Sequence, residues 1–328
     1  MNAVTAVIAQ PPRKPELVSV VARLMGGQVG VHIQPSRSGA GASTAARVAG
    51  RALRRIEAWA NLLTRYSTTS ELSRLNADTR PEVPIRPTLA AVLDWARSAE
   101  GLTDGMVDIA LLDARLTAEG CPDSEVRGGS STSHSSRASR SWSVDRRPLG
   151  GVVRRPPGLR FDLDGVAKGW LADRALDLLD GHSAAVVDGD GDVAIRLRSG
   201  ERIRFGVGDP RRSGCHLAVL ELAGPDGPGE RRFGLATSGT SVHRWVRAGQ
   251  VAHHLIDPRT GWSATTDVVQ ATILARTARE AETLAKTAVI LGSSAALEML
   301  DRLDVHGGIL LTDRDELLIL PSTARWLL

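Results

Sequence analysis

The sequence predicts an α+β fold in which antiparallel sheets pack on helices, and three observations support this prediction. Segments rich in β-forming residues come in pairs separated by short turns, as in β-hairpins. Helical spacing of apolar residues is confined to a few long blocks, such as residues 43–64 and 277–292. No Gly-x-Gly-x-x-Gly run follows a strand, so nothing indicates a nicotinamide dehydrogenase. Hairpins combined with helices in long blocks are typical of α+β layers rather than of a doubly wound sheet.

The first third of the chain is expected to open with a hairpin and to continue into helices. Residues 18–33 alternate and contain Met25-Gly-Gly27, which indicates a hairpin or a bulged strand. Residues 43–64 carry apolar side chains at helical spacing and predict a long helix. The next loop caps a short helix, with Ser70 and Ser73 as candidate caps. A second long helix is predicted over residues 88–101.

The second half of the chain is expected to contain mainly hairpin-linked strands. From Leu159 the predicted order is strand, helix, strand, and Gly181 is a plausible residue to follow the helix end. The other predicted elements are strands over 184–187, 193–197, 202–207, 216–222, 233–236 and 268–274, a helix over 277–292, and a hairpin made by 307–311 and 317–320.

Residues 18–328 are expected to form a single domain, preceded by a flexible, proline-containing tail over residues 1–17. A chain of 328 residues can bury a sizeable core. The interval at about 121–158 differs, because it is rich in Ser, Gly, Pro and Arg. Low apolar content cannot offset the entropy of ordering, so this interval is predicted as a flexible surface insertion. A tolerated loop insertion is a simpler interpretation of it than a binding element.

Composition narrows the class of protein. The formal net charge of +4, with a pI near 9.6, is too small to indicate a nucleic-acid partner, and no aromatic-basic pattern supports one. The two cysteines, Cys121 and Cys215, form no CxxC pair and are expected to be reduced. No run of about 20 apolar residues predicts a membrane span, and the start of the chain has no basic secretory region. We therefore expect a cytoplasmic protein.

The segment Phe161-Asp-Leu-Asp-Gly-Val-Ala-Lys-Gly-Trp-Leu-Ala-Asp-Arg174 carries the most information about function. It is predicted to run from a strand through an acidic turn into a helix. Gly165 and Gly169 allow another backbone or a ligand to approach closely. A helix N-terminus with Lys168 and two nearby carboxylates can hold a phosphate and a metal ion. The simpler alternative is an Asp-capped helix with a solvated lysine.

Five motifs occur in order along the chain. They are Ser70-Glu-Leu-Ser-Arg-Leu-Asn76, Leu102-Thr-Asp-Gly-Met-Val-Asp-Ile109, Asp162-Leu-Asp-Gly-Val-Ala-Lys-Gly-Trp170, Leu235-Ala-Thr-Ser-Gly239 and His254-Leu-Ile-Asp-Pro-Arg-Thr-Gly261. Together they resemble the FAD:protein FMN transferase family, the ApbE-like flavin transferases. Any single match is weak, but five in the family's order are specific. The resemblance implies two interleaved α+β subdomains of the T-fold-like type, with the site between them.

The resemblance also implies the residues of the site. His254 and Asp257 would border the reacting phosphate, where a histidine can relay a proton, and Arg259 is a candidate phosphate clamp. From the residues alone, Tyr66 is equally well explained as a half-buried loop tyrosine, and a lone histidine on a strand is usually structural. The positions implied to bind FAD are Met25, Tyr66, Met106, Val107, Asp108, Asp162, Lys168, Ser238 and Ile256.

One block departs from the family that the sequence resembles. The family's usual Asp-Ala-Leu-Ala-Thr block binds magnesium through its Asp and Thr, together with a carbonyl that corresponds to Gly165. Here the block is Glu282-Thr-Leu-Ala-Lys286, so the implied metal ligands are Gly165 and Glu282 only. An ammonium cannot ligate a cation. Either Glu282 and Lys286 form an ordinary helix pair worth about 0.2–0.5 kcal/mol, or Lys286 is a catalytic cation at the magnesium position.

The resemblance implies a transferase that cleaves FAD and attaches FMN through a phosphoester bond to a Thr or Ser of a target protein. Such phosphoryl transfer depends mainly on positioning and charge neutralisation. Two alternatives stay open. One is a non-catalytic FAD-binding or flavin-carrying protein, and the other is an FAD pyrophosphatase that releases FMN and AMP. The sequence does not define the target protein, the use of magnesium or the oligomeric state.

Overall fold

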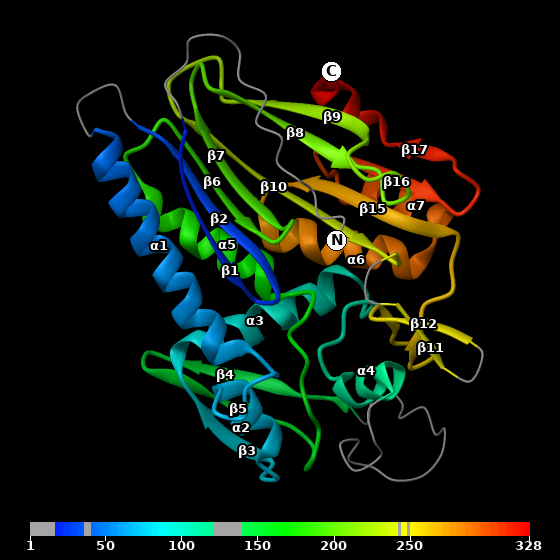
Figure 1. Cartoon of the computed structure of the whole chain (residues 1–328). Helices are drawn as coiled ribbons and strands as arrows, with labels where there is room; N and C mark the ends of the chain where they lie inside the picture. Colours follow the sequence, from blue (N-terminus) through cyan, green and yellow to red (C-terminus); the bar gives the residue numbers. More distant parts are fainter. Residues whose placement is uncertain (1–16, 36–40, 121–139, 242–243, 248–249) are drawn as a thin grey trace.

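The structure, a computed structural model, describes residues 17–35, 41–120, 140–241, 244–247 and 250–328. Within these ranges the chain forms antiparallel sheets packed on helices, which confirms the predicted α+β class (Figure 1). None of the helices in these ranges is both long and apolar enough to cross a bilayer. Apart from Leu17, the predicted tail lies outside the described residues.

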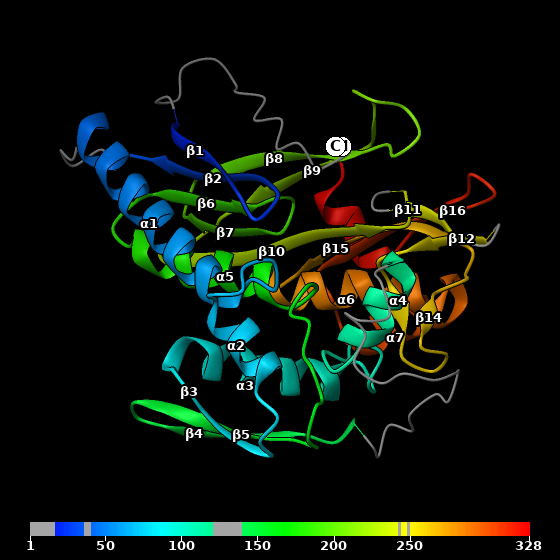
Figure 2. The ribbon, with the colours of Figure 1, turned by 60° about the horizontal axis from the view of Figure 1, so that its bottom comes forward.

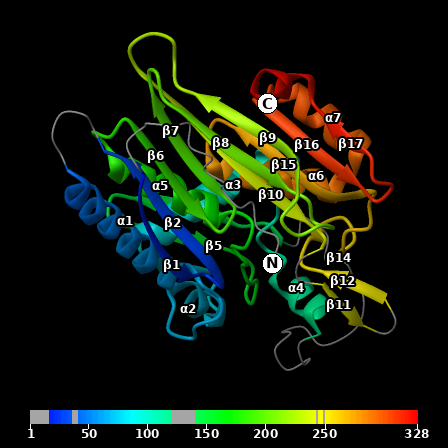
Figure 3. The ribbon, with the colours of Figure 1, turned by 45° about the horizontal axis from the view of Figure 1, so that its top comes forward.

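Strands from both ends of the chain share the main sheet (Figures 1 and 3). Its first two strands are the predicted hairpin, which turns at Met25 and Gly26, both with positive φ. Neighbouring strands are antiparallel throughout the described part of the sheet. The order is β1 (Val18–Leu24), β2 (Gly27–Gln34), β6 (Ala184–Gly189), β7 (Val193–Arg198), β10 (Glu230–Gly239), β15 (Val268–Ala275), β16 (Gly307–Thr312) and β17 (Leu317–Ile319).

Helices cover one face of the main sheet and separate it from a smaller sheet (Figure 2). The helices against the main sheet are α1 (Ala42–Leu63), α5 (Ala167–Leu176) and α6 (Ala278–Leu291). Beyond them lie α3 (Pro87–Leu102) and the antiparallel strands β3 (Glu82–Ile85), β5 (Gly150–Arg154) and β4 (Ser143–Arg147). The hairpin of β8 (Arg202–Gly208) and β9 (His216–Ala223) lies on the opposite face of the main sheet.

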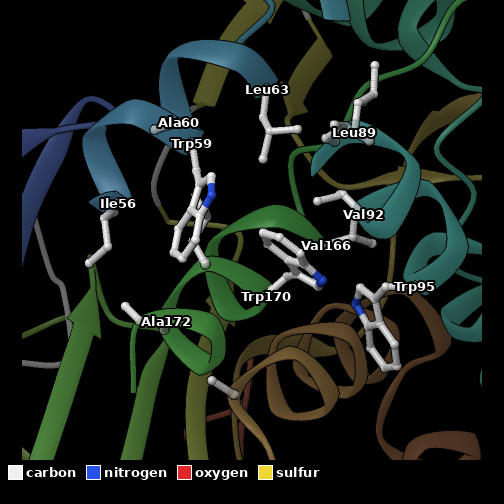
Figure 4. Close-up of a cluster of buried hydrophobic side chains, with 14 of the residues drawn as sticks. Ile56, Trp59, Ala60, Leu63, Leu89, Val92, Trp95, Val166, Trp170 and Ala172 are labelled. Atoms are coloured by element: carbon white, nitrogen blue, oxygen red, sulfur yellow. The ribbon is translucent and has the colours of Figure 1, made fainter. Parts of the chain in front are cut away.

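Tryptophans join the helices in the core between the two sheets. Trp59 of α1 packs edge-on against Trp170 of α5, with ring centroids 6.0 Å apart. Trp170 lies between Trp59 and the side chains of α3, which include Val92 and Trp95 (Figure 4). The apolar residues at helical spacing in α1 are therefore mostly the ones that this helix buries. Burial of the large aromatic side chains stabilises the contact between the three helices.

Helices α5 and α6 approach each other closely and are locked in register. A Cβ atom on Gly169 would lie 2.6 Å from the carbonyl oxygen of Ala278, so only glycine fits here. Asp173 accepts hydrogen bonds from the backbone N–H groups of Ala278 and Arg279, at 2.9 and 3.1 Å. This carboxylate caps the start of α6 and ties it to α5. The two helices carry Lys168 and Lys286, so their register fixes the relative positions of the two lysines.

The prediction of a flexible insertion over 121–158 is wrong for its second part. Residues 143–147 and 150–154 are the strands β4 and β5, and β5 pairs with β3 as well as with β4. Trp142 is only 4% exposed and Val153 is fully buried. Trp142 and Val153 thus pack in the core, although the segment has a low average apolar content. Residues 121–139 of the predicted insertion lie outside the described residues.

The predicted strand before the acidic turn is also absent. Residues 159–163 form no strand; instead, the side-chain amide of Asn76 binds the backbone of Phe161. Asn76 donates to the carbonyl of Phe161 and accepts from its N–H, both at 2.8 Å. A buried side-chain amide thus replaces the strand partner that these backbone groups would otherwise need. This contact gives the motif that ends at Asn76 a structural role beneath the acidic turn.

Several short elements complete the fold. The predicted capping by Ser70 is confirmed, because its hydroxyl accepts from the N–H of Ser73 at 2.9 Å at the start of α2 (Glu71–Ala77). The sequence did not predict α4 or the strands around it. The unpredicted elements outside β3 to β5 are α4 (Leu112–Glu119), α7 (Ser293–Arg302), β11 (Arg244–Arg247), β12 (Gln250–His253), β13 (Ile256–Asp257) and β14 (Trp262–Ser263).

Candidate active site

A pocket forms where four separate parts of the chain meet: the segment before α4 with α4 itself, the acidic turn, the segment around β13, and α6. Six of the residues that the sequence placed at the site line it. The predicted residues are Met106, Asp108, Asp162, His254, Ile256 and Lys286, and they are joined by Leu111, Arg115 and Asp164. Both charge signs face the pocket, as expected for a site that binds a charged ligand.

The acidic turn is held in a defined shape. The N–H of Asp162 donates to the carbonyl of Ile109 at 2.8 Å, and the N–H of Asp164 donates to Oδ1 of Asp162 at 3.1 Å. Gly165 follows with a φ of 101°, which favours glycine. Desolvation in the pocket and the neighbouring Asp164 raise the pKa of Asp162. Desolvation would also raise the pKa of Asp164, but Arg115, Lys168, His254 and Lys286 lower it below its usual range.

Lys168 does not line the pocket but neutralises the buried carboxylates behind it. Its Nζ lies 3.2 Å from Oδ2 of Asp192, which is 4% exposed and sits at the turn between β6 and β7. The charge of Asp192 raises the pKa of Lys168, so this ammonium stays protonated. Glu282 is 3% exposed, and its Oε2 accepts from the N–H of Gly169 at 2.9 Å. Burial and the nearby Asp192 raise the pKa of Glu282 well above its usual range.

The ammonium of Lys286 lies against the acidic turn. Its Nζ donates to the carbonyl of Asp164 at 3.1 Å, and a Cβ atom on Gly165 would be only 2.7 Å from that Nζ. Lys286 therefore reaches across from α6 to the backbone that the resemblance implied as a metal ligand. The lysine is not simply an exposed helix partner of Glu282, since the carboxylate of Glu282 is bound by the N–H of Gly169.

A divalent metal does not fit the residues at this position. Oε1 of Glu282 is buried and has no hydrogen-bond partner, so one carboxylate oxygen could accept a further contact. Within the described ranges, however, no group of three or more His, Cys, Asp or Glu side chains could hold a metal ion. The ammonium of Lys286 also stands at Gly165. A cation there would face a positive charge in place of a ligand.

Two of the proposed phosphate-contacting residues bind each other. Asp257 is 6% exposed, and both of its oxygens accept from Arg259, with distances of 2.8–3.1 Å. Asp257 is absent from the pocket lining, whereas its neighbour Ile256 is present. The Asp-Pro-Arg motif therefore forms a bidentate ion pair at the turn after β13, and neither Asp257 nor Arg259 lines the pocket.

The remaining predicted residues are not among those that line the pocket. Val107 is 1% exposed and packs in the core, and Ser238 lies on β10 opposite Ala271. Met25 lies in the β1–β2 turn. Tyr66 is 79% exposed, with the guanidinium of Arg65 4.3 Å from its ring centroid. The alternative interpretation of Tyr66 as a half-buried loop tyrosine is thus wrong. That Met25, Tyr66, Val107 or Ser238 contacts FAD stays a prediction.

Arg115 is the main site residue that the sequence did not reveal. It is 5% exposed on α4, and its Nη1 donates to the carbonyl of His254 at 2.9 Å and to Oδ2 of Asp164 at 3.2 Å. It belongs to none of the five motifs. A single arginine on a short helix that was not predicted shows no sequence pattern that indicates a site residue. Asp108 is also engaged, since its Oδ2 lies 3.1 Å from Nε of Arg140.

The fold and the pocket together define an α+β protein whose charged cleft is suited to a phosphorylated ligand. The chain belongs to the ApbE family, which matches residues 25–309. The family that the sequence motifs indicated is therefore confirmed.

Named relatives and solved structures agree with this family. The FAD:protein FMN transferase of Treponema pallidum (strain Nichols) is 32% identical over 155 residues, which cover 44% of this chain and 41% of that protein. The chain thus aligns with less than half of that relative's length. The enzyme of the same name from Vibrio cholerae serotype O1 is 25% identical over 242 residues, 71% of this chain and 70% of that protein.

Solved structures show the same fold over almost the whole chain. The flavin transferase ApbE from Vibrio cholerae superposes with a TM-score of 0.72 at 20% identity, over 95% of this chain and 100% of that chain. The ApbE protein of Thermotoga maritima gives a TM-score of 0.75 at 18% identity, over 95% and 99% of the two chains.

Proposed function

We propose that this protein is an FAD:protein FMN transferase. The observation that carries the proposal is the convergence of separate segments on one charged pocket. Met106 and Asp108, then Asp162, His254 and Lys286, are far apart in the sequence but line the same cavity. The relatives named above are called FAD:protein FMN transferases, which gives the same assignment. A site of this kind can hold the diphosphate of a dinucleotide between its cations.

In the proposed reaction, the hydroxyl oxygen of a target Ser or Thr attacks the phosphorus of the FMN half of FAD. A phosphoester bond forms, the bond from that phosphorus to the bridging oxygen breaks, and AMP leaves with the bonding electrons. His254 faces the pocket and is the proposed acceptor of the hydroxyl proton. Lys286 stabilises negative charge on the phosphates, since its ammonium lines the same pocket.

Magnesium has no step in this mechanism, because the residues around Gly165 do not fit it. Lys286 supplies positive charge at that position instead, with its Nζ 3.1 Å from the carbonyl of Asp164. The partner of the proposed enzyme is a target protein that presents a Ser or Thr. A cytoplasmic location stays a prediction from the sequence.

The test is incubation of the purified protein with FAD and a set of Ser- and Thr-containing peptides, followed by mass spectrometry. Transfer yields AMP and a peptide that carries FMN through a phosphoester. Release of AMP and free FMN, with no adduct on any peptide, would indicate the pyrophosphatase alternative. Binding of FAD without products would indicate a non-catalytic flavin carrier, which a pocket with a lysine in place of a metal could also form.

Replacing Tyr66 with alanine should weaken FAD binding by about 1–3 kcal/mol, the range for losing an aromatic packing partner. The ring is 79% exposed, so one face is open for stacking. Tyr66→Phe is the matched control: it keeps the ring and should bind FAD nearly as well. Calorimetry on both variants measures the effect. Equal affinities of Tyr66→Ala and the wild type would place this side chain outside the binding site.

A further inference from the structure

Arg115 lies at the centre of an ion network that joins three segments of the site. Its Nε donates to Oε1 of Glu119 at 2.6 Å, and the same oxygen accepts from Nη2 of Arg65 at 2.5 Å. Nε of Arg65 lies 3.8 Å from Oδ1 of Asp162. The side chains of Arg65, Glu119 and Arg115 are 11%, 14% and 6% exposed. Removing one partner from an ion pair this deeply enclosed leaves a buried charge without compensation, which is more costly than for a surface pair.

The other end of Arg115 contacts the reactive face of the pocket. A single nitrogen, Nη1, bridges the backbone carbonyl of His254 and Oδ2 of Asp164. Residue 254 follows β12, so its backbone is not held by that strand pairing. The hydrogen bond from Arg115 therefore constrains the backbone from which the His254 side chain projects into the pocket.

We propose that Arg115 is a positioning residue for His254. Glu119 and Arg65 orient the guanidinium, and the guanidinium fixes residue 254 relative to the acidic turn. The function of such a contact is geometric, because a catalytic group displaced by about 1 Å can lose about 10²-fold in rate. A lysine cannot replace this arginine, since its single ammonium cannot span Glu119, Asp164 and the carbonyl of His254 at once.

A second ion pair that holds the same helix provides a matched control. Arg160 also joins α4 to the segment before the acidic turn, because its Nε donates to Oδ1 of Asp113 at 2.9 Å. Arg160→Lys therefore perturbs the attachment of α4 without touching the contact to His254. Glu119→Gln is a second test variant. It keeps the size of the side chain but weakens the anchor of Arg115.

The first experiment is NMR of ¹³C,¹⁵N-histidine-labelled protein, with the His254 imidazole resonances assigned by their loss in His254→Ala. Arg115→Lys should shift these resonances, Glu119→Gln should shift them less in the same direction, and Arg160→Lys should leave them in place. This readout does not depend on turnover. Unchanged His254 resonances in Arg115→Lys and Glu119→Gln would overturn the proposal.

The second experiment is a double-mutant cycle on AMP release, which rests on the proposed transferase function. Arg115→Lys should lower kcat by about 10- to 100-fold, with the KM for FAD changed much less. In a His254→Ala background the same substitution should have almost no further effect, because it acts through that residue. Additive losses, or a loss confined to KM, would contradict the positioning role. A wild type that releases no AMP would refute the proposed function instead, and the NMR result would still decide the role of Arg115.

Discussion

Replacing Lys286 with alanine should lower the rate of FMN transfer by about 10²- to 10³-fold, the loss seen when one preorganised charge-stabilising group is removed from an active site. Lys286 lines the pocket, and its ammonium is bound to the carbonyl of Asp164. Without it, the diphosphate of FAD would face the carboxylates of Asp162 and Asp164 with one cation fewer. Transfer by the wild type should persist in EDTA and respond little to added magnesium.

The composition of the chain supports a special role for this ammonium. Of 41 Lys and Arg residues only three are lysines, namely Lys14, Lys168 and Lys286. Lys286 lines the pocket, and Lys168 pairs with the buried Asp192 behind it. A lysine ammonium is a compact point charge, whereas a guanidinium is a broad planar fork. The space beside Gly165, where Nζ of Lys286 lies, is narrow and suits an ammonium better than a guanidinium. Lys286→Arg should therefore recover only part of the activity that Lys286→Ala loses.

Restoring a hydroxyl ligand should change the metal response. Lys286→Thr removes the ammonium and places an oxygen near Glu282, whose Oε1 is buried without a partner. This variant should become dependent on magnesium, because a divalent ion can then supply the missing charge. Arg302→Ala, which removes one exposed positive charge on α7, is the control and should transfer FMN at the wild-type rate. Loss of wild-type activity on chelation would mean that Lys286 does not take the place of a metal.

The sequence was sufficient for elements whose signal is local. The helices α1, α3 and α6 were predicted because their apolar residues recur at helical spacing, and the β1–β2 hairpin because glycines interrupt an alternating run. Strand β4 was not predicted, because it is mostly exposed and its polar sequence resembles that of a loop. At Phe161 a strand was predicted but does not form. The side chain of Asn76, distant in the sequence, binds the N–H and carbonyl groups that a neighbouring strand would otherwise bind.

The candidate site also contains residues that the sequence could predict and residues that it could not. Motifs identified Asp162 and His254, and the block that departs from the family identified Lys286. All three line one pocket. The motifs could not show that Asp257 binds Arg259. The sequence does not distinguish an aspartate that forms an ion pair with the residue two positions later from an aspartate that faces a ligand. Arg115 could not be predicted, since its role depends on contacts between positions more than a hundred residues apart.

Replacing Trp142 with alanine should lower the free energy of unfolding by about 3–5 kcal/mol, the usual range for deleting a large buried aromatic side chain. Trp142 is 4% exposed and packs edge-on against Phe161, with ring centroids 5.0 Å apart. Phe161 is fully buried and leads directly into the acidic turn, so the cavity would open beneath the site. Deletion of residues 127–155, which removes Trp142 together with β4 and β5, should prevent stable folding.

Leu149→Ala is the matched control, because Leu149 lies in the turn between β4 and β5 and is 91% exposed. Its effect on stability should stay within about 0.5 kcal/mol, as for other surface positions. Urea denaturation of the two variants and the wild type provides the comparison. If Trp142→Ala were as stable as Leu149→Ala, the segment around β4 would not pack on the core. The flexible insertion expected from composition would then extend through residue 158, and the acidic turn would lack its aromatic support.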